Sequence, residues 1–208
     1  MSEKPGFAHV PGALDRATQS LLLARIRDVI ALAPLYRPAM PRTGKPLSVC
    51  MTNCGPLGWL TDKEGGYRYT DRHPATGRPW PAMPPILMDL WMQHGAHPGP
   101  PEACLINYYD GGARLGSHRD EDEQDKTAPV VSISLGDDAV FHIGGLKRSD
   151  AKSRILLRSG DIVVLGGAQR LAYHGIDRII AGTSDLLPEG GRFNLTLRRV
   201  TPFDARHA

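Results

Sequence analysis

Cysteine is scarce in this chain, and the few cysteines present predict neither a disulfide framework nor a structural zinc site. Cys50, Cys54 and Cys104 are the three among 208 residues, and the C-x3-C pair is not followed by a second pair. An odd number of cysteines without a metal spacing indicates free thiols, which are typical of a reducing compartment. We therefore expect a cytoplasmic protein that folds without cross-links.

Long apolar runs, a signal-peptide core and a dominant charge sign are also absent. No stretch approaches the length of a membrane span, so we expect no membrane association. The net charge of +3 is a mild basic excess, compatible with a polyanionic partner but insufficient to establish one. The composition gives no sign of an obligate protein partner, and a monomer is the default expectation.

Helical periodicity is confined to two segments in the first half of the chain. In residues 14–32 the apolar positions recur near a helical period, Asp15 is a suitable N-cap, and a proline-containing stretch ends the helix. Residues 84–95 begin with two prolines that suit a first helical turn. Between them, residues 38–82 are rich in Gly, Pro and polar side chains with scattered aromatics, which predicts long loops or short hairpins of functional importance.

Short β-type segments recur between residues 103 and 201. Most are spaced about ten residues apart, which favours a sandwich or barrel over βαβ units. The segments are "CLINYY", "VVSISLG", "AVFHIGG", "RILLRSGDIVVLGG", "LAYHGI" and "RFNLTLRRV". Together with the helices they predict one α+β domain over residues 1–208, in which the helices cover a β-barrel or jelly roll.

A histidine inside an acidic segment suggests part of a metal site. His118 and Asp120 lie two residues apart in "SHRDEDEQD", and positions i and i+2 of an extended segment point to the same side. Two histidines and one carboxylate form the facial triad of non-haem Fe(II) oxygenases, and His174 in "LAYHGI" is the best candidate for the third ligand. Taken alone, an H-x-D pair is more often two solvated surface side chains.

The last β-type segment carries two arginines on one face. Arg192, Asn194, Thr196 and Arg198 alternate with apolar residues in "RFNLTLR". On a surface strand this polar face would simply lie in water. In a small barrel it would point inward, where two arginines need a compensating dianion. Because arginine binds carboxylates through paired hydrogen bonds, a dicarboxylate beside Fe(II) indicates 2-oxoglutarate.

Several stretches of the chain recur, in the same order, in a known family. They are "MTNCGPLGW" (51–59), "RPWPAMP" (78–84), "NYY" (107–109), "SHRDEDE" (117–123), "APVVSISLGDDAVFHIGGLKRSD" (128–150), "GDIVVLGG" (160–167), "YHGI" (173–176) and "RFNLTLRR" (192–199). Over about residues 45–201 the chain resembles the AlkB family of DNA-repair dioxygenases. The resemblance implies a double-stranded β-helix (jelly-roll) core at 103–201 and a nucleotide-recognition lid at 45–82.

The resemblance also implies roles for individual residues. It assigns Fe(II) to His118, Asp120 and His174, and the two ends of 2-oxoglutarate to Arg192 and Arg198, without saying which arginine takes which carboxylate. The other co-substrate positions are Asn107, Tyr109 and Asn194. On the nucleic-acid side, the matching positions are Trp59, Tyr67, Tyr69, Asp122 and Arg148. The segment "KEGGYRY" is one residue longer than in the family, which loosens the tyrosine assignments.

The implied reaction is oxidative demethylation of N-alkylated DNA bases such as 1-methyladenine and 3-methylcytosine. The reaction uses Fe(II) as cofactor and consumes 2-oxoglutarate and O2, and it forms succinate, CO2 and formaldehyde. Single-stranded DNA is the expected substrate, while the same chemistry on RNA or a protein stays open. A non-catalytic barrel is disfavoured because the triad and both arginines are intact.

Two residues and the rest of the acidic segment complete the expectations. Leu165 stands where the family has a bulkier aromatic, and Pro56 interrupts the lid, so both bear on the range of lesions accepted. Glu121, Glu123 and Asp125 are expected to be solvated.

Overall fold

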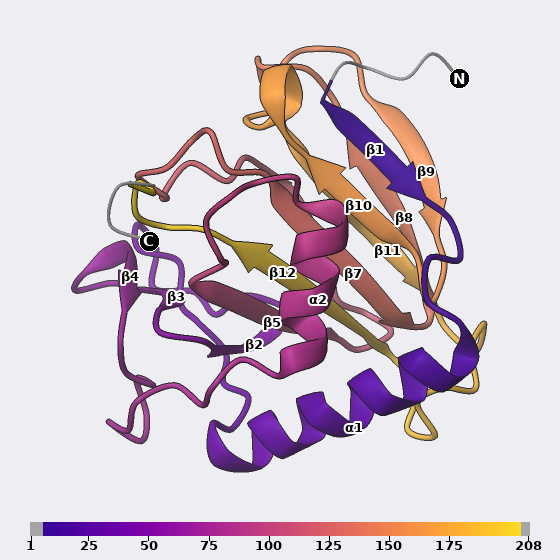
Figure 1. Cartoon of the computed structure of the whole chain (residues 1–208), viewed down its shortest axis with the longest axis horizontal. Coiled ribbons are helices and arrows are strands. Elements are labelled where there is room, and N and C mark those ends of the chain that lie inside the picture. The colour runs from indigo at the N-terminus through magenta and orange to yellow at the C-terminus, as the bar shows by residue number, and fades with distance from the viewer. Residues whose placement is uncertain (1–5, 205–208) are drawn as a thin grey trace.

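Two antiparallel β-sheets face each other in the computed structural model, which describes residues 6–204 (Figure 1). The larger sheet has six strands in the order β1 (Phe7–Val10), β10 (Ile162–Leu165), β7 (Val130–Gly136), β12 (Arg192–Arg198), β5 (Ala103–Tyr109) and β2 (Cys50–Cys54). The smaller sheet has four strands in the order β6 (Leu115–His118), β11 (His174–Ile180), β8 (Asp138–Ile143) and β9 (Ser153–Leu157). The predicted α+β jelly roll is confirmed.

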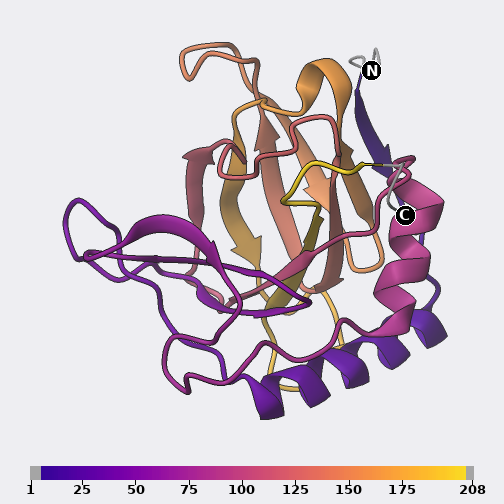
Figure 2. The ribbon, with the colours of Figure 1, turned by 60° about the vertical axis from the view of Figure 1, so that its left-hand side comes forward.

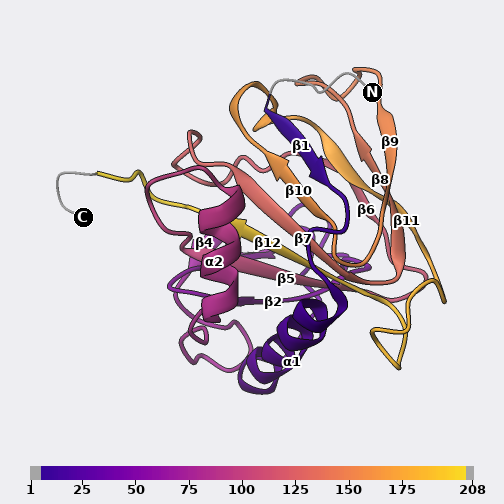
Figure 3. The ribbon, with the colours of Figure 1, turned by 45° about the vertical axis from the view of Figure 1, so that its right-hand side comes forward.

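The two sheets face each other (Figure 3), and one hydrophobic cluster has members from both. It joins Leu105 and Val163 of the larger sheet to Phe141, Leu157 and Ile176 of the smaller one. Each strand alternates its side chains between its two faces, so every second residue points toward the opposite sheet. The apolar residues among these pack against each other and hold the sheets together. The short 3-10 helix Gly167–Gln169 follows β10.

Two helices cover the outer face of the larger sheet (Figure 1). Helix α1 (Arg16–Leu32) begins after Asp15, whose carboxylate accepts a hydrogen bond from the Thr18 backbone N–H, as predicted for an N-cap. Helix α2 (Pro85–His94) has Pro84 at its N-cap. Both predicted helices are confirmed to within two residues at each end. In residues 6–204 no helix is both long and apolar enough to cross a membrane.

A second hydrophobic cluster lies between the two helices and the larger sheet. Strand β12 contributes its apolar side chains to this cluster, which leaves its other face free for polar groups. Phe193, Leu195 and Leu197 lie in the cluster beneath the helices. The alternate residues of β12 therefore point between the two sheets, so the predicted inward face is the one with both arginines.

The segment between the helices is partly strand and partly hairpin. Strand β2 pairs with β5 at the edge of the larger sheet, so this portion of residues 38–82 is core structure and not the loop that composition predicts. Strands β3 (Gly58–Asp62) and β4 (Gly66–Thr70) form a hairpin that extends beyond the two sheets (Figure 2). It lies in the segment predicted to be a lid and is called the lid hairpin below after that prediction. Strand β1, which pairs with β10, was not predicted either.

Candidate active site

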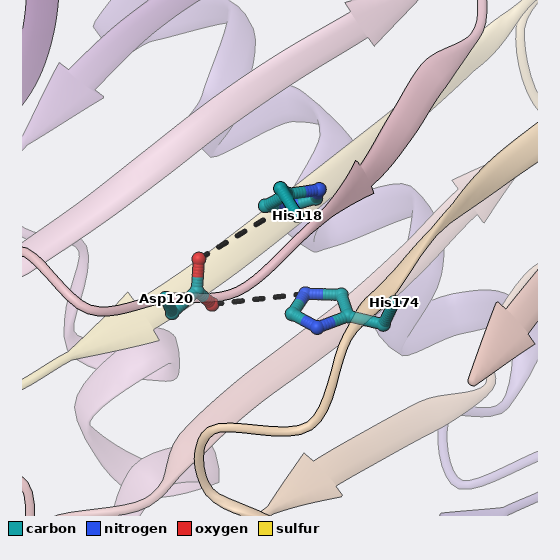
Figure 4. A group of neighbouring side chains, drawn as sticks. All are labelled: His118, Asp120 and His174. Atoms are coloured by element: carbon teal, nitrogen blue, oxygen red, sulfur yellow. Dashed lines mark ion pairs between the residues drawn. The ribbon is translucent and has the colours of Figure 1, made fainter. Parts of the chain in front are cut away.

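The pairing of β6 with β11 brings two distant histidines together. His118 at the end of β6 lies directly opposite His174 at the start of β11, and their ring centroids are 4.5 Å apart. Asp120, two residues beyond His118, points into the same space (Figure 4). Its two carboxylate oxygens lie 3.9 Å from His118 Nε2 and 3.9 Å from His174 Nε2.

Both imidazoles are oriented in the same way by the backbone. The Nδ1 of His118 is 2.9 Å from the carbonyl oxygen of Gly116, and the Nδ1 of His174 is 2.9 Å from that of Ala172. Each Nδ1–H donates to a carbonyl two residues earlier, which leaves the Nε2 lone pair directed at Asp120. Metal-binding histidines are commonly held in this tautomer by such a hydrogen bond.

The charges at this site also suit a divalent cation. Burial alone would raise the pKa of Asp120, but the Arg198 guanidinium and the two imidazoles outweigh it and hold that pKa well below its usual range. Burial and the neighbouring His118 lower the pKa of His174 to about 4. A carboxylate and a neutral imidazole are therefore present at neutral pH, as metal ligation requires.

The ligand atoms of the three residues lie within 4.8 Å of one another. Asp120 Oδ2 is buried without a hydrogen-bond partner among the described residues, as expected of an oxygen that serves a metal. Two imidazoles and one carboxylate on one side form the set typical of non-haem Fe(II) oxygenases, which leaves other coordination positions open. The residues present therefore fit Fe(II).

A cavity of about 460 Å³ opens beside these three residues. Its wall includes eleven of the thirteen side chains predicted for the site: Trp59, Tyr67, Asn107, Tyr109, His118, Asp120, Asp122, Arg148, His174, Asn194 and Arg198. Tyr69 and Arg192 do not line it. Leu165 lines the cavity, whereas Pro56 lies exposed in the turn before β3.

The two arginines of β12 differ in their partners. Arg198 Nη2 donates to Asp120 Oδ1 at 2.8 Å, so it is paired with a predicted metal ligand. Arg192 is fully buried. Among the described residues its Nη atoms donate to two neutral oxygens, the Asp137 carbonyl at 3.0 Å and Ser134 Oγ at 2.6 Å. Burial lowers the pKa of Arg192 to about 10, so it is still a cation near neutral pH.

Several polar atoms near these arginines lack a hydrogen bond within residues 6–204. The Nε atoms of Arg192 and Arg198 and Asn107 Oδ1 are buried without hydrogen bonds among the described residues. Buried polar groups are rarely left unpaired unless a ligand or water satisfies them. Two buried guanidiniums lie beside the metal-binding cluster: Arg192 has an Nε that is unpaired in this part of the chain, and the Nε of Arg198 lies 3.5 Å from Glu123 Oε1 in an ion pair. Two such cations fit a dicarboxylate such as 2-oxoglutarate.

At the mouth of the cavity, the lid hairpin contacts the core. Trp59 Nε1 donates to Asp122 Oδ2 at 2.7 Å, and its ring stacks on Tyr67 with centroids 5.8 Å apart. On another part of the wall the guanidinium of Arg148 lies 6.0 Å from the ring centroid of Tyr173. The cavity wall thus combines an aromatic pair with a carboxylate and, elsewhere, a cation, groups suited to a charged nucleotide.

The structure corrects one expectation for the acidic segment. Glu121 is exposed as predicted, but Glu123 and Asp125 are 2% and 6% exposed. Asp125 accepts hydrogen bonds from the backbone N–H groups of Thr127 and Ala128, which fold the chain back toward β7. Glu123 pairs with Arg170 at 2.9 Å. Sequence reasoning missed both, because burial of one acid in a polar run depends on contacts from distant segments.

Metal addition is expected to stabilise the metal-free protein through the three ligands. At a Mn(II) concentration of about one hundred times Kd, binding adds about 2.7 kcal/mol to the free energy of unfolding. For a domain of this size this corresponds to a rise of about 5–10 °C in Tm. We expect Asp120→Ala to lose the rise, measured by thermal unfolding with and without Mn(II). The matched variant Asp122→Ala should keep it, and equal responses of the two would remove Asp120 from the ligand set.

Comparisons with known proteins agree with this geometry. A sequence profile described as "2OG-Fe(II) oxygenase superfamily" matches residues 6–198. The chain is 54% identical over 198 residues to "Alpha-ketoglutarate-dependent dioxygenase AlkB homolog" of Caulobacter vibrioides, which covers 94% of this chain and 88% of that protein. It is 46% identical over 183 residues to "Alpha-ketoglutarate-dependent dioxygenase AlkB" of Escherichia coli, covering 86% and 83%. The solved structure titled "The structure of OsALKBH1" superimposes with a TM-score of 0.78 at 30% identity, over 96% of this chain and 99% of that one.

Proposed function

Because this chain belongs to the 2OG-Fe(II) oxygenase superfamily and has close AlkB relatives, we propose that it removes methyl groups oxidatively from N-alkylated bases of DNA. It is a dioxygenase that depends on Fe(II), 2-oxoglutarate and O2. The observation that carries the proposal is the cluster of His118, Asp120 and His174, which lies in a cavity whose mouth has the Trp59–Asp122 pair.

The metal centre supplies oxidising chemistry that no side chain of this protein provides. When bound, Fe(II) together with 2-oxoglutarate and O2 supplies the oxygen atom that converts an N-methyl group to N-hydroxymethyl, while 2-oxoglutarate becomes succinate and CO2. The hydroxymethyl product then releases formaldehyde and the repaired base. The protein's residues bind and orient the reactants and limit competing reactions.

The two arginines divide the co-substrate between them. Arg198 lies at the metal end, since it already touches Asp120, and we assign it the carboxylate next to the keto group. Arg192 lies six positions earlier on the same strand face and would bind the other carboxylate. Asn107, Tyr109 and Asn194 line the wall and offer polar contacts along the co-substrate.

The mouth of the cavity is suited to a base that has left the DNA stack. Alkylation on the Watson–Crick edge weakens pairing, which lowers the cost of flipping the base out. Stacking on an aromatic such as Trp59 contributes about 1–3 kcal/mol per base in comparable sites. Tyr67 and Arg148 line the same cavity and would contact the nucleotide or its phosphate. The carboxylate of Asp122 would favour a cationic base such as 1-methyladenine or 3-methylcytosine.

Replacing Asp122 should change which lesions are repaired. We expect Asp122→Ala to lower kcat/KM about tenfold for 1-methyladenine, a cation, and only slightly for neutral 3-methylthymine, because one attraction of about 1.4 kcal/mol corresponds to a tenfold change. Formaldehyde release from the two oligonucleotides measures the difference. Glu121→Ala, in the same exposed segment, is the matched control. Equal losses on both lesions would remove the role of Asp122 as a charge selector.

The decisive experiment is a competition among substrates. Single-stranded DNA containing 1-methyladenine is incubated with the protein, Fe(II), ascorbate, 2-oxoglutarate and O2, beside methylated RNA and a methylated peptide. Formaldehyde from DNA that requires 2-oxoglutarate supports the proposal, while release only from RNA or peptide would move the substrate class. Preference for single strands, a monomeric state and a cytoplasmic location stay predictions.

A further inference from the structure

Glu123 is the centre of a buried network of charges behind the cavity wall. Its Oε2 accepts a hydrogen bond from Arg170 Nη2 at 2.9 Å, and its Oε1 lies 3.5 Å from Arg198 Nε. Glu123 is 2% exposed and Arg170 is 2% exposed. Burial of four charged groups is costly unless they compensate each other, and here Glu123 and Asp120 balance Arg170 and Arg198.

The same carboxylate holds the lid hairpin. Tyr69, on β4, donates its hydroxyl hydrogen to Glu123 Oε1 at 2.5 Å. Its oxygen in turn accepts a hydrogen bond from Arg198 Nη1 at 3.3 Å. This places the Tyr69 hydroxyl between the lid hairpin and the arginine that we assign to the co-substrate, although Tyr69 does not line the cavity.

Arg170 connects the network to the metal-binding segment. Its Nη1 donates to the backbone carbonyl of Asp120 at 2.7 Å, and its Nε donates to the carbonyl of Ala128 at 2.8 Å. A guanidinium with three such contacts fixes the segment that carries the metal ligand. Glu123 therefore contacts Arg198 directly, the lid hairpin through Tyr69, and the segment of the metal ligand Asp120 through Arg170.

We propose that Glu123 is a positioning residue that couples the lid hairpin, through Tyr69, to the binding of 2-oxoglutarate by Arg198. The proposal rests on the assignment of Arg198 to the co-substrate made above. It gives Tyr69 a role in co-substrate binding in place of the nucleotide contact that the sequence predicts. Coupling of this kind is reciprocal, so co-substrate binding also holds the lid hairpin in place.

The test uses 2-oxoglutarate and Mn(II), which does not start turnover, so that binding is measured without catalysis. Isothermal calorimetry of 2-oxoglutarate with the Mn(II)-loaded protein gives Kd. We expect Tyr69→Phe to weaken binding about three- to tenfold, the effect expected for one lost hydrogen bond. Tyr69→Phe keeps the aromatic ring, so this variant should fold. It therefore tests the proposal even if Glu123→Gln, which neutralises one of four buried charges, proves unstable.

A second readout separates positioning from plain structural support. In the wild-type protein, 2-oxoglutarate should slow hydrogen exchange of the lid-hairpin amides, residues 58–70, and in Tyr69→Phe this slowing should disappear. If Glu123→Gln folds, the double variant Tyr69→Phe/Glu123→Gln should bind 2-oxoglutarate no more weakly than Glu123→Gln alone. Both substitutions act through the same Tyr69–Glu123 hydrogen bond, so their effects should not add. The matched controls are Tyr108→Phe, which loses a hydroxyl bonded to the Gly190 carbonyl, and Glu121→Gln; both should leave Kd unchanged.

Three results would count against the proposal. An unchanged Kd and unchanged hairpin exchange in Tyr69→Phe would overturn the coupling while leaving the proposed function intact. A lower Tm without a change in Kd would reduce Glu123 and Tyr69 to structural support and also overturn it. Failure of wild-type protein to bind 2-oxoglutarate would overturn the co-substrate assignment of Arg198, and the coupling with it.

Discussion

His174→Ala is expected to abolish formaldehyde release that depends on 2-oxoglutarate. His174 is 8% exposed, its Nε2 faces Asp120, and its Nδ1 is held by the Ala172 carbonyl. Within residues 6–204 the cluster consists of His118, Asp120 and His174, so the substitution leaves two ligands. Loss of a hydrogen bond to a metal ligand already costs about 10–100-fold in metal affinity or activity, and loss of the ligand itself should cost more. Formaldehyde and succinate are measured together on single-stranded DNA containing 1-methyladenine.

The matched control is His94→Ala, a half-buried histidine at the end of α2, which should leave both products unchanged. Succinate without formaldehyde in the wild-type protein would show a working iron site and a wrong substrate. Full activity of His174→Ala would contradict the proposed ligand set.

Arg192→Met is expected to weaken 2-oxoglutarate binding strongly without destabilising the protein. Truncating one partner of a buried, hydrogen-bonded charge pair costs about 2–5 kcal/mol, which is at least about thirtyfold in Kd. Without ligand, however, the hydrogen bonds of the Arg192 guanidinium within residues 6–204 all go to neutral oxygens. Burying a cation outside an ion pair is costly, so replacing Arg192 by an apolar side chain of similar length should change the free energy of unfolding little. Affinity and stability should therefore change independently.

Calorimetry with Mn(II)-loaded protein gives the affinity, and thermal unfolding of the ligand-free protein gives the stability. Arg25→Met, which removes an exposed arginine from α1, controls for the change in net charge and should affect neither. If Arg192→Met binds 2-oxoglutarate normally, the second carboxylate must be held elsewhere. A large fall in Tm would show that Arg192 has a structural role in the ligand-free protein.

Local sequence determined the elements whose signals repeat along the chain. Alternation in residues 192–198 predicted a strand with one apolar face and one face bearing both arginines, but left open whether the arginines lie in water or point inward. In β12 they point inward because the apolar side chains pack under the helices. The N-cap at Asp15 and the apolar period after it predicted α1. These features depend on neighbours a few residues away, which the sequence contains.

The metal cluster was predicted in part from local sequence and in part from resemblance. The H-x-D spacing put His118 and Asp120 on one side of an extended segment, but nothing near them in sequence specifies the third ligand. His174 joins them because β11 pairs with β6 in a register that sets His174 opposite His118. Register is decided by the packing of whole strands between the sheets, which is a tertiary property.

Only the tertiary structure decided which charges are buried. Glu121 and Glu123 lie two residues apart in one acidic segment, yet the first is exposed and the second is 2% exposed, because Arg170, Arg198 and Tyr69 converge on it from three other segments. The edge strands β1 and β2 were likewise missed, since they are short and exist through pairing with β10 and β5. Sequence determined the chemical groups of the site; long-range contacts determined which of them meet, because burial and pairing free energy come from residues far apart in the chain.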